Sequence, residues 1–137
     1  MIVFLLSFVL LITLTIIVVV FGSKTVWHFT QNQQINAFKL NKSIYISSAS
    51  KICEQTKNML FSTSYYEVLI EQTSELMNKC NVASVSVEDG NIFYEQKSRV
   101  LWMFPHGIVY VQNMKMIPEW RKLIHIEENW FYYHDAS

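Results

Sequence analysis

The chain opens with an uncharged run from Met1 to Ser23 that contains no lysine, arginine, aspartate, glutamate or proline, and the first charged side chain is Lys24. Most of this run is isoleucine, valine, leucine and phenylalanine. A helix of about 20 residues spans about 30 Å, which is the thickness of the hydrocarbon core of a bilayer. The run therefore predicts a transmembrane helix at residues 1–23, and it ties the rest of the chain to a membrane.

A cleaved secretory signal is the main alternative for this run. Such signals carry a basic segment ahead of an apolar core of about 7–15 residues. Here no basic residue precedes the apolar core, and the core is longer. These features favour an uncleaved signal-anchor, although Phe21-Gly22-Ser23 could act as a weak cleavage site. A buried core helix is the third alternative, for which the run is long.

The charges beside the run say little about which side of the membrane the rest of the chain occupies. Lys24 alone lies close on the C-terminal flank. It weakly favours a cytoplasmic C-terminal part. Two cysteines, many aromatic side chains and the tendency of short N-terminal anchors to export the domain behind them favour the other side. We expect an extracytoplasmic domain, periplasmic or extracellular, with a cytoplasmic one as the alternative.

The remaining residues divide into a short connecting segment and one small domain. Residues 24–44 contain three lysines and no acid and are rich in glutamine and asparagine, which indicates a juxtamembrane stalk. Residues 45–137 are enough for one modest core. The formal net charge is zero. No basic patch therefore favours a nucleic-acid partner.

The hydrophobic pattern of the domain changes from a helical to a strand period near residue 80. Apolar side chains at helical spacing predict helices at 47–61 and 65–79, the second with a capping box at Ser64 and Glu67. Asp89-Gly90 predicts a tight hairpin, and residues 105–107 a turn. Period-two patterns predict strands at 83–87, 91–95, 100–104, 108–111, 123–126 and 130–133. The fold class is α+β: two antiparallel helices, then an antiparallel β-meander of four to six strands.

The two cysteines, Cys53 and Cys80, are candidates for a disulfide. Each lies on, or at the end of, the apolar face of its predicted helix. In an antiparallel helix pair they would come to the same end, where a bond would close a loop of about 27 residues and stabilise the fold by about 3–4 kcal/mol. The alternative is two reduced, buried cysteines that act as small apolar residues.

The aromatic residues of the last third are the strongest functional lead. Alternation places Trp130 and Tyr132 on one face of the sheet, and Phe131 and Tyr133 on the other. An uncovered face would form a partner-binding patch. The alternative is a core with aromatic side chains on both faces, under the helices and under the loop at 114–121. The candidate partner-binding residues are Trp120, Trp130, Tyr132 and Tyr133.

Motifs for catalysis, metals or cofactors are not found in the sequence. The four histidines lack ligand spacing, and no phosphate-binding loop or nucleophile elbow occurs. We therefore expect a non-catalytic, single-pass membrane protein with no cofactor or metal, whose domain binds another protein, as an inhibitor, a toxin-immunity protein or an accessory protein does. A structural subunit of a larger membrane complex is one alternative. A ligand sensor or enzyme with a pocket between the helices and the sheet is another.

Overall fold

The computed structural model of this chain describes the backbone of residues 2–56, 63–97 and 104–135. Within its helices, the side chains of residues 2–6, 8, 18–29, 63–70 and 72 lie outside the description. The chain divides into two units, Met1–Gln33 and Gln34–Ser137. The predicted capping box of Ser64 and Glu67 falls on residues 63–70, so it lies outside the described side chains.

The first unit is helical and belongs to α1 (Ile2–Leu40). The large apolar side chains described between Val9 and Ile17 are all at least 43% exposed. The hydroxyl groups of Thr13 and Thr15 donate hydrogen bonds to backbone carbonyls one turn earlier, at 2.9 and 2.7 Å. Within the part of the chain that the structure describes, no helix reaches the length and hydropathy that a membrane span requires.

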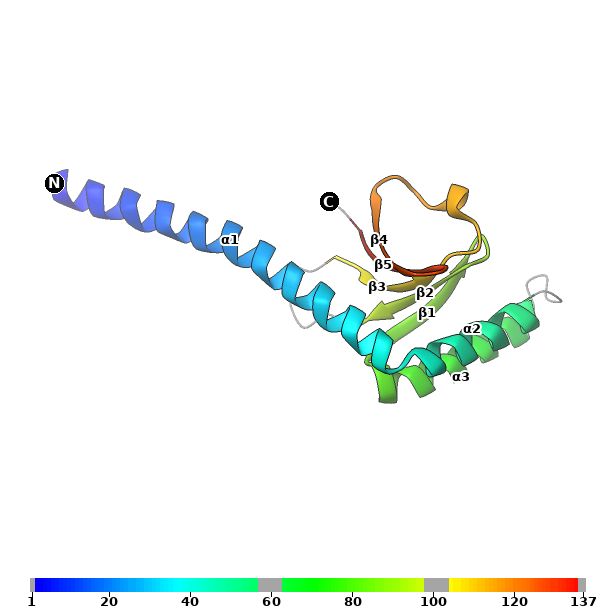
Figure 1. The fold of residues 1–137 in the computed structure, drawn as a ribbon. Coiled ribbons are helices and arrows are strands. Elements are labelled where there is room, and N and C mark those ends of the chain that lie inside the picture. Colours follow the sequence, from blue (N-terminus) through cyan, green and yellow to red (C-terminus); the bar gives the residue numbers. More distant parts are fainter. Residues whose placement is uncertain (1, 57–62, 98–103, 136–137) are drawn as a thin grey trace. The chain divides into compact units, whose positions relative to one another are not determined.

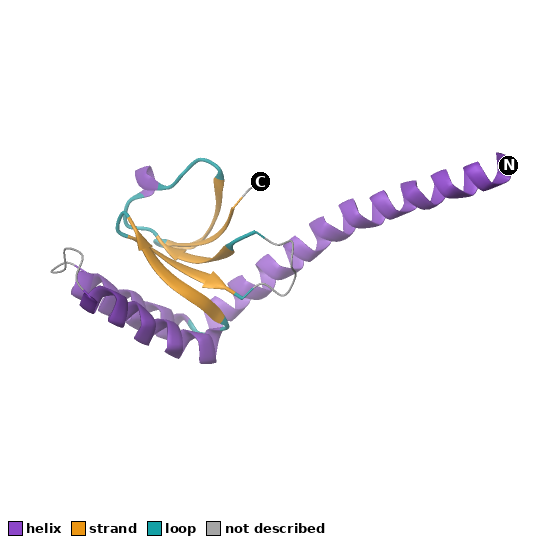
Figure 2. Ribbon diagram, turned by 180° about the vertical axis from the view of Figure 1, so that it is seen from behind, coloured by secondary structure: helices purple, strands orange, loops and turns teal. Residues whose placement is uncertain are grey.

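In its described residues, the second unit contains the end of α1, two further α-helices and five strands (Figure 1). The helices α2 (Lys42–Thr56) and α3 (Thr63–Cys80) lie side by side. The strands that come after them are β1 (Val82–Glu88), β2 (Asn91–Gln96), β3 (His106–Tyr110), β4 (Arg121–Glu127) and β5 (Trp130–Asp135), with a short 3₁₀ helix, η1 (Met114–Met116), before β4. The helices cover one face of the sheet (Figure 2). The predicted α+β class is confirmed.

The five strands form one antiparallel sheet in the order β1-β2-β3-β5-β4. The predicted simple meander is wrong at its end, because β5 pairs with β3 and leaves β4 at the edge. The predicted turn at 105–107 is also wrong for His106 and Gly107, which are paired within β3. The strand predicted at 100–104 lies outside the described residues except for Phe104, which is in no strand.

The core on the helical face joins all three helices to the sheet. Tyr45 and Ile52 of α2 and Leu76 of α3 are fully or almost fully buried against sheet residues such as Ile108. Phe38, near the end of α1, is also fully buried, and its ring lies 5.1 Å from those of Tyr45 and Trp130. The segment predicted to be a stalk thus supplies a core residue to the second unit.

Two polar contacts cross this core, and each gives its buried groups a hydrogen-bond partner. The Tyr94 hydroxyl donates to the Ser48 hydroxyl at 3.2 Å, and the side-chain amide of Gln96 bonds the Tyr45 hydroxyl at 3.1 Å. Both contacts join α2 to β2. They fix α2 at one rotation about its axis, and that rotation decides which of its residues border the sheet.

The opposite face of the sheet has a smaller core under the connection between β3 and β4. Phe93, Val109, Val111 and Tyr133 are buried there, with Ile117 of the connection packed against them. The side chain of Asn91 holds the start of the connection, because its oxygen accepts from the backbone N–H groups of residues 112 and 113 at 2.9 and 2.8 Å. The sheet is therefore covered on both faces.

Arg121 closes this second core at the start of β4. Its guanidinium lies 4.5 Å from the centroid of the Phe93 ring and 5.3 Å from that of Tyr133. The same group pairs with Asp135 at 2.7 Å and with Glu88 at 3.1 Å. Its side chain is 10% exposed and that of Asp135 is 15% exposed. Loss of Arg121 would leave the mostly buried Asp135 carboxylate without this ion-pair partner.

We expect Arg121→Met to lower the free energy of unfolding by about 1–3 kcal/mol, because it keeps the apolar contact and strands the Asp135 carboxylate. Lys122→Met is the matched control, since Lys122 is the exposed neighbour on the same strand. Urea denaturation of the three proteins measures the difference. Equal destabilisation by the two substitutions would show that the charge of Arg121 adds nothing.

Candidate functional site: a pocket between α2 and the sheet

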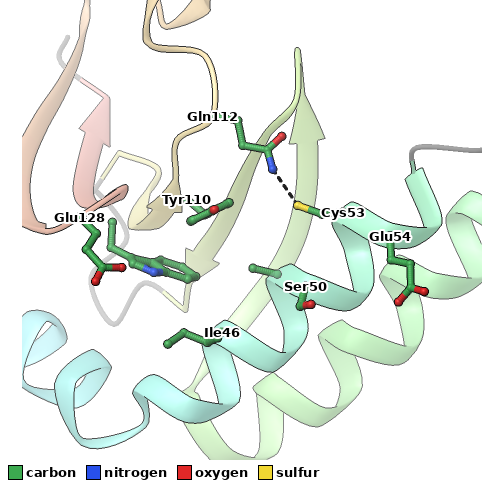
Figure 3. Close-up of a pocket in the computed structure, with 9 residues that line it drawn as sticks. Ile46, Ser50, Cys53, Glu54, Tyr110, Gln112 and Glu128 are labelled. Atoms are coloured by element: carbon green, nitrogen blue, oxygen red, sulfur yellow. Dashed lines mark hydrogen bonds between the residues drawn. The ribbon is translucent and has the colours of Figure 1, made fainter.

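A pocket of about 490 Å³ lies between α2 and the sheet (Figure 3). Its volume falls in the range of small-molecule sites, about 300–1,000 Å³. Its described lining comes from α2, from β3 and the residues after it, and from the β4–β5 turn and the start of β5. The lining residues are Ile46, Ala49, Ser50, Cys53, Glu54, Tyr110, Gln112, Glu128 and Trp130.

The helical wall of the pocket is a stripe along α2. The lining positions 46, 49, 50, 53 and 54 have the spacing i, i+3, i+4, i+7 and i+8. This spacing places them on one side of a helix. Ala49 and Ser50, at the middle of the stripe, are small. Their short side chains leave space beside the sheet wall.

The sheet wall is aromatic and firmly packed. The rings of Tyr110 and Trp130 lie with centroids 4.9 Å apart at an interplanar angle of 48°. Trp130 also contacts Phe38, Tyr45 and Tyr94, with ring centroids 5.1 to 6.1 Å away. A ring held on several sides cannot turn freely, so the aromatic wall is fixed in place.

One end of the pocket is bridged by a polar contact. The side-chain amide of Gln112 donates to the sulfur of Cys53 at 2.9 Å, as the dashed line in Figure 3 marks. The backbone N–H of Gln112 is held by Asn91. Asn91 thus positions Gln112, and Gln112 joins the end of β3 to α2.

The charged side chains in the described lining are both acidic. Glu54 lies on α2, and Glu128 lies in the β4–β5 turn; both are exposed. The backbone φ of Glu128 is positive, at 43°. Few non-glycine residues adopt this left-handed region. The nearby Lys42 pairs with Glu127 at 2.7 Å, and this hydrogen bond raises the pKa of Lys42. No ion pair of Glu54 or Glu128 occurs among the described residues.

The predicted disulfide is not formed: Cys53 and Cys80 are both free. The prediction began the first helix at residue 47 and so put Cys53 near its start, but α2 begins at Lys42. Cys80 interacts with Tyr45. Cys53 lies two turns beyond Tyr45 on α2, which is about 12 Å along the axis. Bridging needs Cα atoms within about 7 Å. Burial raises the pKa of the Cys80 thiol.

We expect thiol reagents to label Cys53 at least about tenfold faster than Cys80 in the folded protein, because a buried thiol must wait for local opening. Cys80 is 8% exposed, whereas Cys53 is partly exposed. Mass spectrometry of peptides after timed alkylation measures both rates. Cys53→Ser and Cys80→Ser variants assign the signals. Equal rates in the folded protein, together with equal rates in denaturant, would contradict the burial of Cys80.

Three of the four predicted partner-binding residues have buried side chains. Trp130 is 2% exposed, Tyr132 is fully buried and Tyr133 is 2% exposed, so they do not form a surface patch. The alternating faces were placed correctly, but helices cover one of them and the β3–β4 connection covers the other. Trp120 alone is exposed, at 52%.

The fold and this pocket define a class: an α+β domain with a partly open, aromatic-walled pocket beside its first packed helix. In the described residues, no three metal-ligating side chains come together. No family model matches the sequence, and no curated protein or solved structure is significantly similar to the chain.

Proposed function

We propose that this chain is a membrane-anchored, non-catalytic binding domain that takes up a small molecule in the pocket between α2 and the sheet. The pocket carries the proposal. It combines a volume suited to a small ligand, a rigid aromatic wall and a few polar groups at its border, which is the usual composition of ligand sites. The burial of three aromatic candidates removes the main argument for a protein partner as the first choice.

A thermal-shift screen of the full-length protein against a metabolite library tests the pocket. A ligand that binds only the folded state raises the melting temperature, by an amount that grows with its concentration relative to Kd. Ser50→Leu would fill the pocket, and we expect it to abolish the shift. Ser47→Leu is the matched control, because Ser47 is exposed on the same helix and outside the lining. A library without any stabilising compound would contradict the proposal.

The membrane anchor is the second part of the proposal. It is supported by the charge-free run at residues 1–23 and by the described side chains from Val9 to Ile17, most of which are apolar and exposed. The hydroxyls of Thr13 and Thr15 are satisfied by their own helix. Lipid surroundings demand this of polar groups. Extraction of cell membranes with alkaline carbonate tests the anchor, and release of the chain into the supernatant would overturn it.

The side of the membrane is also a proposal, with the domain on the extracytoplasmic side. It is supported by the tendency of short N-terminal anchors to export the domain behind them. A membrane-impermeant thiol reagent applied to intact cells should label Cys53, which is partly exposed. Labelling that needs cell lysis would place the domain in the cytoplasm, the alternative that Lys24 favours.

A protein partner is the second candidate function, and one observation favours it. The β3–β4 connection exposes Met114, Met116 and Trp120, each by about half of its surface (51, 49 and 52%). Methionine and tryptophan are enriched in protein interfaces. A photo-crosslinking residue at 116 or 120 should give a discrete adduct in cells, and one at exposed Met77 on α3 should not. The same adducts from position 77 would argue against this surface.

A further inference from the structure

We infer that the pocket selects an organic cation with an apolar body, such as an aromatic or alkyl amine, an inference that rests on the proposed function. Two features of the lining lead to it. The apolar and aromatic part of the lining comes from Ile46, Ala49, Tyr110 and Trp130. The exposed border carries two carboxylates, Glu54 and Glu128, and no lysine or arginine among the described lining residues.

The carboxylates are available to a ligand. The neighbouring cation, Lys42, is hydrogen-bonded to Glu127 at 2.7 Å and interacts with Glu128 only through its longer-range charge. Glu54 and Glu128 have no such ion-pair partner in the described part of the chain, and they come from different elements, α2 and the β4–β5 turn. An anion would meet the negative charge of these carboxylates, which Lys42 offsets only in part, and a cation would be attracted.

The aromatic wall adds to the same preference. The face of a tryptophan or tyrosine ring attracts a cation within about 6 Å, with a contribution that is larger where water is excluded. Trp130 is fixed by its aromatic neighbours and Tyr110 is only partly buried, so one ring of the pair can meet a ligand without a large rearrangement.

The polar residues of the lining suit an ammonium group as well. Ser50, which carries a hydroxyl, and Gln112, which carries a side-chain oxygen, belong to the lining. Both can accept hydrogen bonds, and an ammonium group has donors only. The side-chain nitrogen of Gln112 is used by Cys53. The lining thus offers acceptors at the border and apolar surface inside, which matches a molecule with a cationic head and an apolar body.

Three probes of similar shape and different charge test this inference: 2-phenylethylamine, 2-phenylethanol and 3-phenylpropanoate. They are titrated into the full-length protein in micelles, and binding is read from NMR shifts of the Gln112 side-chain amide and the Trp130 indole N–H. We expect the amine to bind about tenfold more tightly than the alcohol. We expect the carboxylate to bind more weakly than both. Added salt should weaken the binding of the amine, because it screens the attraction between charges.

Two conservative variants connect the preference to the border. Glu128→Gln and Glu54→Gln each remove a charge from an exposed position. Each should weaken the affinity for the amine by about threefold and leave the affinity for the alcohol unchanged. Glu119→Gln is the matched control, because Glu119 is exposed on the β3–β4 connection and outside the lining. Loss of amine binding in all three variants alike would attribute it to overall charge and overturn the inference.

The outcomes separate this inference from the proposed function. If the alcohol or the carboxylate binds at least as tightly as the amine and Ser50→Leu abolishes that binding, the cation preference is wrong and the pocket stands. If none of the probes shifts the Gln112 or Trp130 signals at millimolar concentration, the cation preference is again wrong. The thermal-shift screen then decides the proposed function by itself.

Discussion

Gly107→Ala is expected to destabilise the domain by about 3 kcal/mol, among the largest effects of any single methyl group added to it. Gly107 lies in β3, between Glu95 of β2 and Tyr133 of β5. A Cβ atom there would overlap the carbonyl oxygen of Tyr94 and come within 3.0 and 3.1 Å of the Tyr94 carbonyl carbon and the Gln96 nitrogen. These are backbone atoms of a paired strand, so no side-chain rotation can relieve the contact.

Gly90→Ala is the matched control for this substitution. Its Cβ would meet only the Gln112 side chain, at an ordinary 3.6 Å, but the φ of Gly90 is 84°. Alanine in this left-handed region costs about 1 kcal/mol of backbone strain. Chemical denaturation of the full-length protein should therefore rank Gly107→Ala well below Gly90→Ala in stability. A similar small loss in both would mean that β2 and β3 separate easily, and the strand pairing at Gly107 would need revision.

The local parts of the fold were predictable from the sequence because their causes are local. Asp89 and Gly90 adopt φ values of 50° and 84°, and β1 and β2 pair on either side of them. Two successive positive φ angles are the backbone of a tight hairpin turn. The change from a helical to a strand period near residue 80 also falls where α3 ends, at Cys80. Each of these features depends on residues close together in the chain.

The strand order and the start of α2 depend on distant residues. Gly107 lies just after a proline and looked like part of a turn, but pairing with β2 and β5 places it inside the sheet. The first turns of α2 hold several serines. Serine is a weak helix former. These turns become helical because Tyr45 and Ser48 are anchored to β2, which lies far along the chain. Misplacing this start also misplaced Cys53 and led to the wrong disulfide.

The pocket itself was beyond the local pattern. Its helical wall uses positions 46, 49, 50, 53 and 54. Several of these residues are small or polar, so they do not form the apolar stripe by which a buried helix face is recognised in a sequence. The sheet wall depends on Trp130, which lies opposite Tyr110 only because β5 pairs with β3. The sequence allowed a pocket between the helices and the sheet as one alternative, but it did not predict which residues line that pocket.

Phe38→Ala is expected to lower the free energy of unfolding by about 3–5 kcal/mol, the usual cost of truncating a buried phenylalanine. Phe38 is fully buried, and its ring contacts Tyr45 and Trp130 at the centre of the helical-face core. Since Trp130 also forms the pocket wall, the cavity left by Phe38 should loosen that wall and weaken ligand binding in the same variant.

Leu40→Ala is the control from the same turn of α1, because Leu40 is 85% exposed. Its truncation should change stability by less than about 0.5 kcal/mol. Urea denaturation of the full-length variants gives both values. If Phe38→Ala were as mild as Leu40→Ala, the domain would begin after residue 44, as a stalk would require. A large loss confined to Phe38 means instead that the end of α1 is part of the domain, where its ring packs on Trp130 of the pocket wall.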